Sequence, residues 1–261
     1  MNYNHVRELD TQGFTIIKKL VNTEWLEKLK DALKDAFNIH REIQVKNGND
    51  ITTGGVALHV ILSNDIFIDF LEELIRIGFI DDLRANYFKS NFILNSFSAL
   101  DNQPNQLNFS SIVHRDLRFY TGSVPVMLNA LVMLDDFTEE NGPTLLLAGS
   151  HKKEEKLTDE FFYANASKAL GQAGDILIFN SNVWHASSLN KSQNSRRALP
   201  LTFTKSLIKQ LLDYPRALGY DRMDLFNERL RQLLGYHARV PANLQEWYMP
   251  FEKRFYKKNE D

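Results

Sequence analysis

The spacing of apolar residues changes twice along the chain and divides it into three stretches. In the first stretch, a short strand is predicted over residues 13–21, followed by a helix for which Thr23 is a suitable N-cap. A second helix is predicted from Asn64, where apolar residues recur at helical spacing, and Gly78 is placed to end it. This stretch is therefore expected to be mainly helical.

From about residue 91 to residue 205, short β-prone runs replace the helical spacing, with polar or Gly/Pro-rich segments between them. The predicted strands cover residues 92–97, 113–120, 126–134, 175–180 and 198–204. Several short strands in succession favour a barrel or a sandwich. In the third stretch helical spacing returns over residues 224–234, directly before Gly235.

The length and composition agree with one large domain. A chain of 261 residues with 43% hydrophobic content can bury a substantial core. No repeat or linker marks a boundary, so we expect a single domain over residues 1–261, mainly β with flanking helices. Its β core would span about 91–205, with helical support from 14–90 and 206–261.

Composition also limits the classes of function. The chain contains no cysteine, which excludes disulfides, thiolate metal sites and cysteine nucleophiles. A net charge of −2 gives no indication of a nucleic-acid partner. Residues 1–10 lack the apolar run of a signal peptide, and no segment has the length of a membrane span. We expect a cytoplasmic protein, a monomer or homodimer, that acts on a small molecule away from membranes.

Three residues carry the strongest chemical signal. His114 and Asp116 lie two positions apart in a predicted strand, so their side chains should share one face. His185 follows another apolar run and could supply a third ligand. Two imidazoles and one carboxylate suit Fe(II) and leave coordination positions open for a cosubstrate and oxygen. A lone His-x-Asp is common by chance, however, and most of the seven histidines must be ordinary.

At these residues the sequence resembles the phytanoyl-CoA dioxygenase family of Fe(II)/2-oxoglutarate-dependent oxygenases. The likeness runs from about residue 10 to 206 and rests on five stretches. They are GFTII at 13–17, HRD at 114–116, ENGPT at 140–144, GSHK at 149–152, and the segment from Gly174 through His185 and Asn190 to Arg196. The resemblance implies a double-stranded β-helix, a distorted jelly roll or cupin-like barrel. It also implies Fe(II) held by His114, Asp116 and His185, with 2-oxoglutarate and O2 as cosubstrates.

The resemblance also assigns roles to two further residues. Arg196 would hold the distal carboxylate of 2-oxoglutarate, for which a planar guanidinium is better matched than an ammonium group. Arg197 should face the opposite way on the strand and is a natural control. Ser187 matches a position that contacts the cosubstrate, although a hydroxyl satisfied within its strand would explain it almost as well.

Four other residues are candidates from their positions alone. Asn95 and Asn129 are polar residues inside apolar strand runs, where burial without a partner is costly. Each could contact cosubstrate or substrate, or could equally bond neighbouring backbone. Arg118 and Tyr120 would continue the face of His114 if no bulge intervened, and could contact substrate, Arg118 through an anionic group.

Several remaining features are given simpler roles. His151 is expected to organise a loop and not to bind metal. The acidic residues at 135–136 and 139–140 and the charged run at 152–156 are expected to be solvated. The loops at 47–56 and 101–112 are candidates for a lid over the barrel mouth.

The expected function is hydroxylation of an unactivated C–H bond of a small metabolite, with release of succinate and CO2. Because a carboxylate is present at Asp116, halogenation is not expected. Two alternatives remain open at this point. A metal-dependent hydrolase or isomerase on a cupin-like barrel would work with zinc or manganese and would leave Arg196 and Ser187 without a role. A non-catalytic protein that binds 2-oxoglutarate or metal would form no succinate.

Overall fold

The computed structural model describes residues 1–49, 55–106, 109–155 and 157–255. Its strands are β1 (Phe14–Ile17), β2 (Val56–Ala57), β3 (Ile93–Phe97), β4 (Ala99–Asn102), β5 (Met127–Met133), β6 (Thr144–Leu146), β7 (Ser167–Lys168), β8 (Ile176–Asn180), β9 (His185–Ser187) and β10 (Arg196–Thr204). Its α-helices are α1 (Tyr3–Thr11), α2 (Thr23–Lys46), α3 (Ile66–Arg76), α4 (Phe79–Leu83), α5 (Asp159–Asn165), α6 (Tyr214–Leu218), α7 (Glu228–Leu234) and α8 (Leu244–Trp247).

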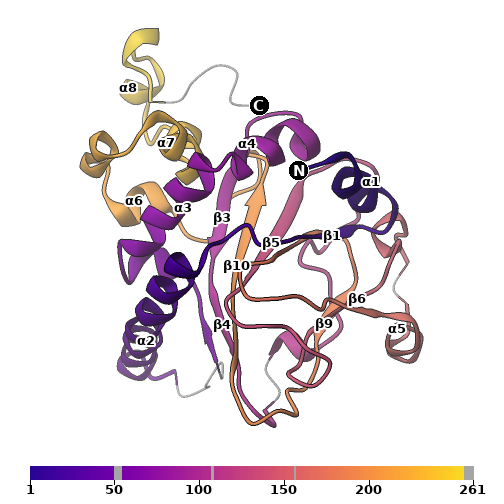
Figure 1. The fold of residues 1–261 in the computed structure, drawn as a ribbon. Helices are drawn as coiled ribbons and strands as arrows, with labels where there is room; N and C mark the ends of the chain where they lie inside the picture. Colours follow the sequence, from indigo (N-terminus) through magenta and orange to yellow (C-terminus); the bar gives the residue numbers. More distant parts are fainter. Residues whose placement is uncertain (50–54, 107–108, 156, 256–261) are drawn as a thin grey trace.

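The strands form two antiparallel sheets. The larger sheet has the order β1-β8-β5-β10-β4-β2, with β3 also paired to β10, and the smaller has the order β7-β6-β9. In Figure 1 helices α2, α3, α6 and α7 lie on one side of the larger sheet, and β6 and β9 lie on the other. Residues of both sheets line one cavity. This is the predicted double-stranded β-helix, a distorted jelly roll with flanking helices.

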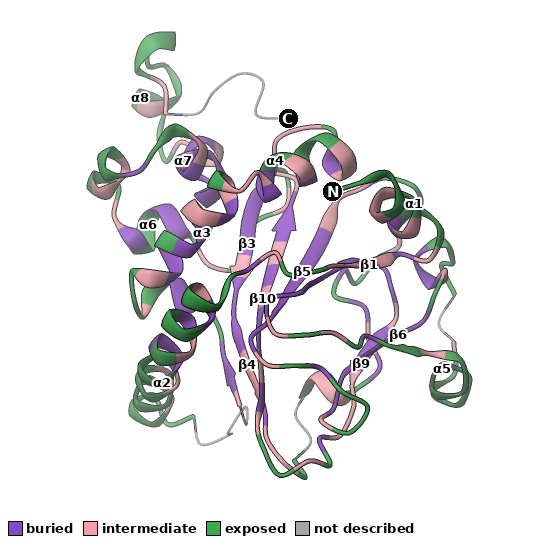
Figure 2. Ribbon diagram, viewed as in Figure 1, coloured by how far each residue is buried: buried purple, intermediate pink, exposed green. Residues whose placement is uncertain are grey.

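Alternation along the central strands separates a helix-facing side from a cavity-facing side. On β5, β8 and β10, every second residue joins the large apolar core shared with the helices: Leu128, Ala130, Val132, Ile176, Ile178, Leu199, Leu201 and Phe203. The residues between them face the space enclosed by the two sheets. Figure 2 shows these strands buried beneath helices whose outer surfaces are exposed. The side of the sheet that faces the helices is therefore sealed by apolar contact.

Strand β10 changes partners along one edge, and Pro200 lies at the change. Residues Arg196 to Ala198 pair with β4, whereas Leu201 to Thr204 pair with β3. The carbonyl of Pro200 accepts a bond from the amide of Ser98, which lies between those two strands. The missing N–H of proline therefore falls where the ladder is already interrupted, which explains a proline inside a long strand.

Several predicted elements are confirmed with adjusted limits. Five of the six predicted strands correspond to β1, β3, β5, β8 and β10, and Gly78, in the left-handed region, follows α3. The side chain of Asn22, and not that of Thr23, caps α2, which continues to Lys46. The last predicted helix begins at Glu228, because residues 221–225 form a 3-10 turn instead. The short strands β2, β4, β6, β7 and β9 and the helices α1 and α5 carry too little periodicity to have been predicted.

The predicted strand at 113–120 is wrong. Within this segment only His114 forms a β-bridge, and the chain then runs irregularly toward Tyr120. The apolar residues Val113 and Leu117 suggested a strand, and both are buried, but they belong to an irregular segment, in which Val113 packs with Leu145 and Ala186. Of the loops proposed as a lid, residues 50–54 and 107–108 lie outside the described residues. None of the helices in the described part of the chain has the length and apolar character needed to span a membrane.

Candidate active site

A single β-bridge brings the two candidate histidines together. The amide of His114 donates to the carbonyl of His185 at 3.0 Å, and the amide of His185 donates back to His114 at the same distance. Two residues that exchange bonds in this way present their side chains on the same face of a sheet. The ring centroids are accordingly 4.2 Å apart. Shared orientation of the ligands thus comes from pairing with β9, and not from a strand through His114.

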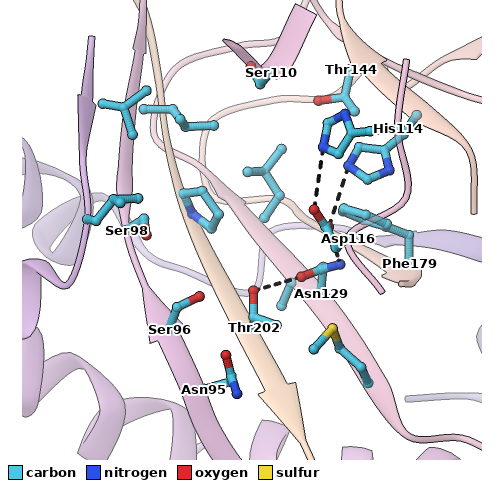
Figure 3. Close-up of a pocket in the computed structure, with 18 of the residues that line it drawn as sticks. Asn95, Ser96, Ser98, Ser110, His114, Asp116, Asn129, Thr144, Phe179 and Thr202 are labelled. Atoms are coloured by element: carbon cyan, nitrogen blue, oxygen red, sulfur yellow. Dashed lines mark hydrogen bonds and ion pairs between the residues drawn. The ribbon is translucent and has the colours of Figure 1, made fainter. Parts of the chain in front are cut away.

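Asp116 completes the group by returning toward both rings (Figure 3). Its Oδ1 lies 3.4 Å from Nε2 of His114, and its Oδ2 lies 3.5 Å from Nε2 of His185. One ligand atom from each of the three residues falls within 4.8 Å of the others. Nδ1 of His114 lies 2.7 Å from the carbonyl of Ile112, and Nδ1 of His185 lies 3.0 Å from that of Val183. Because a carbonyl only accepts, each Nδ1 carries the hydrogen and each Nε2 keeps a lone pair for a metal.

The electrostatics of His185 and Asp116 favour metal binding, and His114 responds to the charge of Asp116. Burial lowers the pKa of His185, which keeps this imidazole neutral near pH 7. Burial pushes the pKa of Asp116 upward, but the two histidines and Asn129 outweigh it and hold that pKa below its ordinary value. In His114 burial is outweighed by the hydrogen bond and charge of Asp116, so its pKa is raised. The donor set, the imidazole tautomers and the ionised carboxylate all fit a divalent iron.

Asn129 holds the carboxylate ligand. Its Nδ2 donates to Oδ2 of Asp116 at 2.7 Å and to Oγ of Ser181 at 2.9 Å, and its Oδ1 accepts from Oγ1 of Thr202 at 2.8 Å. Both hydrogens of the amide are thereby used, and its oxygen accepts one bond. We therefore revise the prediction that Asn129 contacts cosubstrate: its side chain positions Asp116. The contribution of Thr202 was missed, although its even spacing from Arg196 along the strand places both on the cavity side.

Arg196 is a buried cation with unused hydrogen-bonding capacity. It is 1% exposed, its Nη2 donates to the carbonyl of Gly142 at 2.6 Å and to Oγ of Ser187 at 3.4 Å, and its guanidinium lies 4.2 Å from the ring of Phe137. Its Nε and Nη1 are buried and have no partner among the described residues. Burial lowers the pKa of Arg196 to about 10, so it remains charged at neutral pH. A buried charge with two free donors fits an incoming carboxylate.

The ENGPT segment makes this arrangement possible. Gly142 has a φ of +75°, and a Cβ there would lie 2.3 Å from Nδ2 of Asn102 and 2.5 Å from the carbonyl of Ser188. Only glycine can therefore bring its carbonyl this close to Arg196. Ser187, which lies between His185 and the arginine, also lines the cavity. The structure thus brings Arg196 and Ser187 together as predicted.

Arg197 leaves the opposite face of β10. Its guanidinium bonds both carboxylate oxygens of Asp135, at 2.9 and 3.0 Å, and Lys30 approaches the same carboxylate at 2.8 Å. The prediction that Asp135 lies in a solvated turn is therefore wrong, since its side chain is only 18% exposed and is held in an ion pair. The neighbouring Asp136 and Glu139 are exposed as predicted.

Arg115 connects the metal-binding loop to the GSHK segment. Its guanidinium donates to the carbonyls of Ser150, Lys153 and Glu154 and lies 4.6 Å from the ring of Trp184. Oγ of Ser150 in turn accepts from the amide of Trp184, directly before His185. The GSHK segment thus fixes both ligand-bearing segments. The ring of His151 lies 3.2 Å from the carbonyl of Asp10, in agreement with a role in organising a loop.

The three ligands open into a cavity of about 470 Å³ between the sheets. Its lining includes Asn95, Ser96, Ser98, Leu100, Ser110, Arg118, Met127, Asn129, Leu131, Thr144, Phe179, Ser187, Pro200, Thr202 and Leu211. Arg118 therefore borders the cavity as predicted. Tyr120 does not, because its hydroxyl turns away and donates to the carbonyl of Lys152 at 2.9 Å. The irregular path after Asp116 separates these two residues.

Comparison with known proteins agrees with this geometry. The family model described as phytanoyl-CoA dioxygenase matches residues 9–198. The chain is 28% identical to Uncharacterized protein Rv1501 of Mycobacterium tuberculosis, over 97% of this chain and 93% of that protein. It is 26% identical to Dioxygenase olcK of Penicillium canescens, over 80% of this chain and 74% of the other. Among solved structures, the non-heme alpha-ketoglutarate-dependent carbocyclase SnoK from nogalamycin biosynthesis has the same fold, with a TM-score of 0.59, 19% identity, and coverage of 78% and 84% of the two chains.

Proposed function

The chain belongs to the phytanoyl-CoA dioxygenase family and is an Fe(II)/2-oxoglutarate-dependent dioxygenase; from this premise we propose that it hydroxylates an unactivated C–H bond of a small-molecule metabolite. The proposal assigns Fe(II) to His114, Asp116 and His185, and 2-oxoglutarate to Arg196 and Ser187. When bound, iron and 2-oxoglutarate react with O2 to supply the oxidant for the substrate, and 2-oxoglutarate leaves as succinate and CO2.

The observation that carries the proposal is the free guanidinium edge of Arg196. A buried cation with unused donors is costly unless a ligand completes it. A dicarboxylate can place one carboxylate on Arg196 and Ser187 and direct its other end toward the metal ligands. A hydrolase or isomerase using the same three ligands would leave this charge without a purpose.

The residues of the chain contribute positioning and protection. Asn129 keeps Asp116 oriented toward the two histidines, and Arg115 holds the loop that carries His114 and Asp116. The apolar side chains of Leu131 and Phe179 line the cavity and exclude water from one side of the ligands. Because Asp116 supplies a carboxylate ligand, we propose hydroxylation in preference to halogenation. The enzyme would act as a cytoplasmic monomer or homodimer.

The proposal is tested by an anaerobic titration of metal-free protein with Fe(II) and 2-oxoglutarate, followed by visible absorption for the charge-transfer band of a chelated keto acid. We expect the band in the intact protein, its loss in His114→Ala and a higher 2-oxoglutarate requirement in Arg196→Ala. Arg197→Ala is the matched control and should keep the band. Bound iron without a band in the intact protein would contradict the proposal.

A further inference from the structure

A β-bulge in β3 turns two consecutive polar residues toward the cavity. On β10, Thr202 pairs with Ser96 and the next residue, Phe203, pairs with Leu94, so Asn95 is the extra residue of the bulge. Leu94 and Phe97 consequently both join the core beneath the helices. Asn95 and Ser96 both line the cavity, which adjacent residues of a regular strand cannot do. A bulge of this kind re-aims a side chain into a binding site.

The bulge creates a polar strip formed by Asn95, Ser96 and Ser98. Asn95 is 2% exposed and Ser98 is 7% exposed. In the described part of the chain Asn95 bonds through its Nδ2 and not through its Oδ1, and the hydroxyls of Ser96 and Ser98 take part in no side-chain hydrogen bond. All three residues line the cavity. None of the three atoms is fully enclosed by protein, so each is accessible from the cavity and can bond a ligand that fills it.

The orientation of the Asn95 amide follows from its other contacts. Its Nδ2 donates to the backbone carbonyl of Lys209 at 3.0 Å and lies 3.5 Å from Oγ1 of Thr204. A carbonyl accepts only, so turning the amide over would set Oδ1 against the carbonyl of Lys209, whereas the Thr204 hydroxyl can donate or accept. Oδ1 is thereby left as the free atom of this amide. The group that binds beside it must supply a hydrogen, as a hydroxyl or an amide N–H does.

The polar strip lies away from the proposed cosubstrate residues. Asn95 contacts Thr204, eight residues along β10 from Arg196, which is roughly 25 Å of extended strand. In the direction across the sheet, Ser96, Thr202 and Asn129 lie in register on three adjacent strands, which puts the strip about 10 Å from Asn129. Figure 3 shows Asn95, Ser96 and Ser98 on the wall that faces the metal ligands. Of the two ligands predicted for Asn95, this position favours substrate over cosubstrate.

We infer that the substrate is an uncharged, mainly apolar molecule bearing a hydroxyl or amide N–H group, which binds to the polar strip while the carbon to be oxidised faces the triad. The inference rests on the proposed function. Thr202 and Asn129 lie between the strip and the triad and bond each other and Asp116, whereas Leu100, Met127, Leu131 and Pro200 give the cavity lining its apolar part. Besides the triad, the charged residue found in the described lining is Arg118, which is exposed. An ionised group at the strip would therefore be buried without a counter-charge.

The test compares three probes that share one apolar cage: 2-adamantanol, 2-adamantanone and adamantane-1-carboxylate. Their binding is measured by ligand-observed NMR on the full chain loaded with Zn(II) and 2-oxoglutarate, which is diamagnetic and does not turn over. We expect the alcohol to bind on the order of tenfold more tightly than the ketone, because the ketone sets one acceptor against another at Asn95. Asn95→Leu should abolish this preference and Ser98→Ala should reduce it. Met127→Leu, which changes an apolar wall residue, should keep it.

Three outcomes would overturn the inference. They are equal or weaker binding of the alcohol, tightest binding of the carboxylate with dependence on Arg118, or no binding of any probe. If Asn95→Leu does not fold, Ser98→Ala against Met127→Leu still decides the point. The probe series requires neither iron nor oxygen, so its result is independent of the charge-transfer band. A preference for the alcohol without a band would leave the polar strip intact and contradict only the oxygenase proposal.

Discussion

The two faces of β10 show two different uses of one strand. The face toward the helices carries Leu199, Leu201 and Phe203, all fully buried in apolar contact. The face on the cavity side carries Thr202, whose hydroxyl bonds Asn129, and Arg196, whose Nε and Nη1 have no partner among the described residues. The first face contributes stability through burial of apolar surface. The second buries a charge that reduces stability while it is unpaired, and in the proposed function a carboxylate of 2-oxoglutarate pairs it.

Arg196 and Arg197 lie on opposite faces of β10 and differ in the same way as the two faces. They are adjacent and chemically identical, yet Arg197 is paired with Asp135 at both oxygens whereas Arg196 keeps two donors free. The difference comes from the alternation of the strand alone. Substitutions on the helix-facing side should therefore change folding, and substitutions on the cavity side should change ligand binding.

The largest expected effect is on the helix-facing side. Phe203→Ala removes a fully buried ring that packs edge-on against Phe92 at 5.4 Å, and should lower the free energy of unfolding by about 3–5 kcal/mol. Urea unfolding followed by circular dichroism measures this. The folded fraction should still form the charge-transfer band. A stable variant that had lost the band would contradict the expectation that helix-facing residues affect folding and not ligand binding.

Arg196→Met, on the cavity side, should not lower the stability of the ligand-free protein but should weaken 2-oxoglutarate binding. Without ligands the variant should be as stable as the parent protein or more stable, because it no longer buries an unpaired charge. At a 2-oxoglutarate concentration of 100 times Kd, the metal-loaded parent should gain about 2.7 kcal/mol, and the variant should gain little. Thermal denaturation with and without 2-oxoglutarate measures both. Equal ligand-induced shifts in the two proteins would remove Arg196 from the site.

Asn129→Leu should weaken metal binding by about 10–100-fold, because Asp116 loses the amide that orients it. Competition with a chromophoric chelator for Co(II) measures the affinity. Thr202→Val is the matched control: it removes the bond to the far side of the same amide and should have a smaller effect. Unchanged Co(II) affinity in Asn129→Leu would show that metal binding does not depend on the hydrogen bond from Asn129 to Asp116.

The smallest effect is expected at the ion pair outside the cavity. Burial raises the pKa of Asp135, but the hydrogen bonds and charge of Arg197 and Lys30 outweigh it and hold that pKa below its ordinary value. A depressed carboxylate pKa stabilises the protein above the unfolded-state value of about 3.9, and this stabilisation is lost as the pH falls through the folded-state pKa.

Asp135→Asn should therefore cost about 1 kcal/mol at neutral pH, and the difference from the parent should shrink below about pH 4. Chemical unfolding at pH 7 and at successively lower pH measures this difference. A gap that widened on acidification would mean that the sign of the pKa shift is wrong. The charge-transfer band should be unaffected, since Asp135 lies on the side of β10 away from the ligands.

Features with a regular spacing of apolar residues could be predicted from the sequence. Alternation within β5, β8 and β10 assigned Arg196 and Arg197 to opposite faces, and helical spacing located α2 and α3, because these signals are local and are repeated several times. His114, Asp116 and His185 were identifiable because their residue types and the surrounding segments resemble a known family. The short strands and the cap of α2 were not, since each depends on one or two residues.

Tertiary structure alone decided which polar groups find partners. Asn95 and Asn129 look alike in sequence, yet one is turned into the cavity by a bulge that depends on its register with β10, and the other is enclosed by Ser181, Thr202 and Asp116 from separate segments. The pairing of His114 with His185 is equally non-local, and it orients the two side chains without a strand over 113–120. Register and long-range pairing are set by the packing of whole sheets, so no local pattern in the chain encodes them.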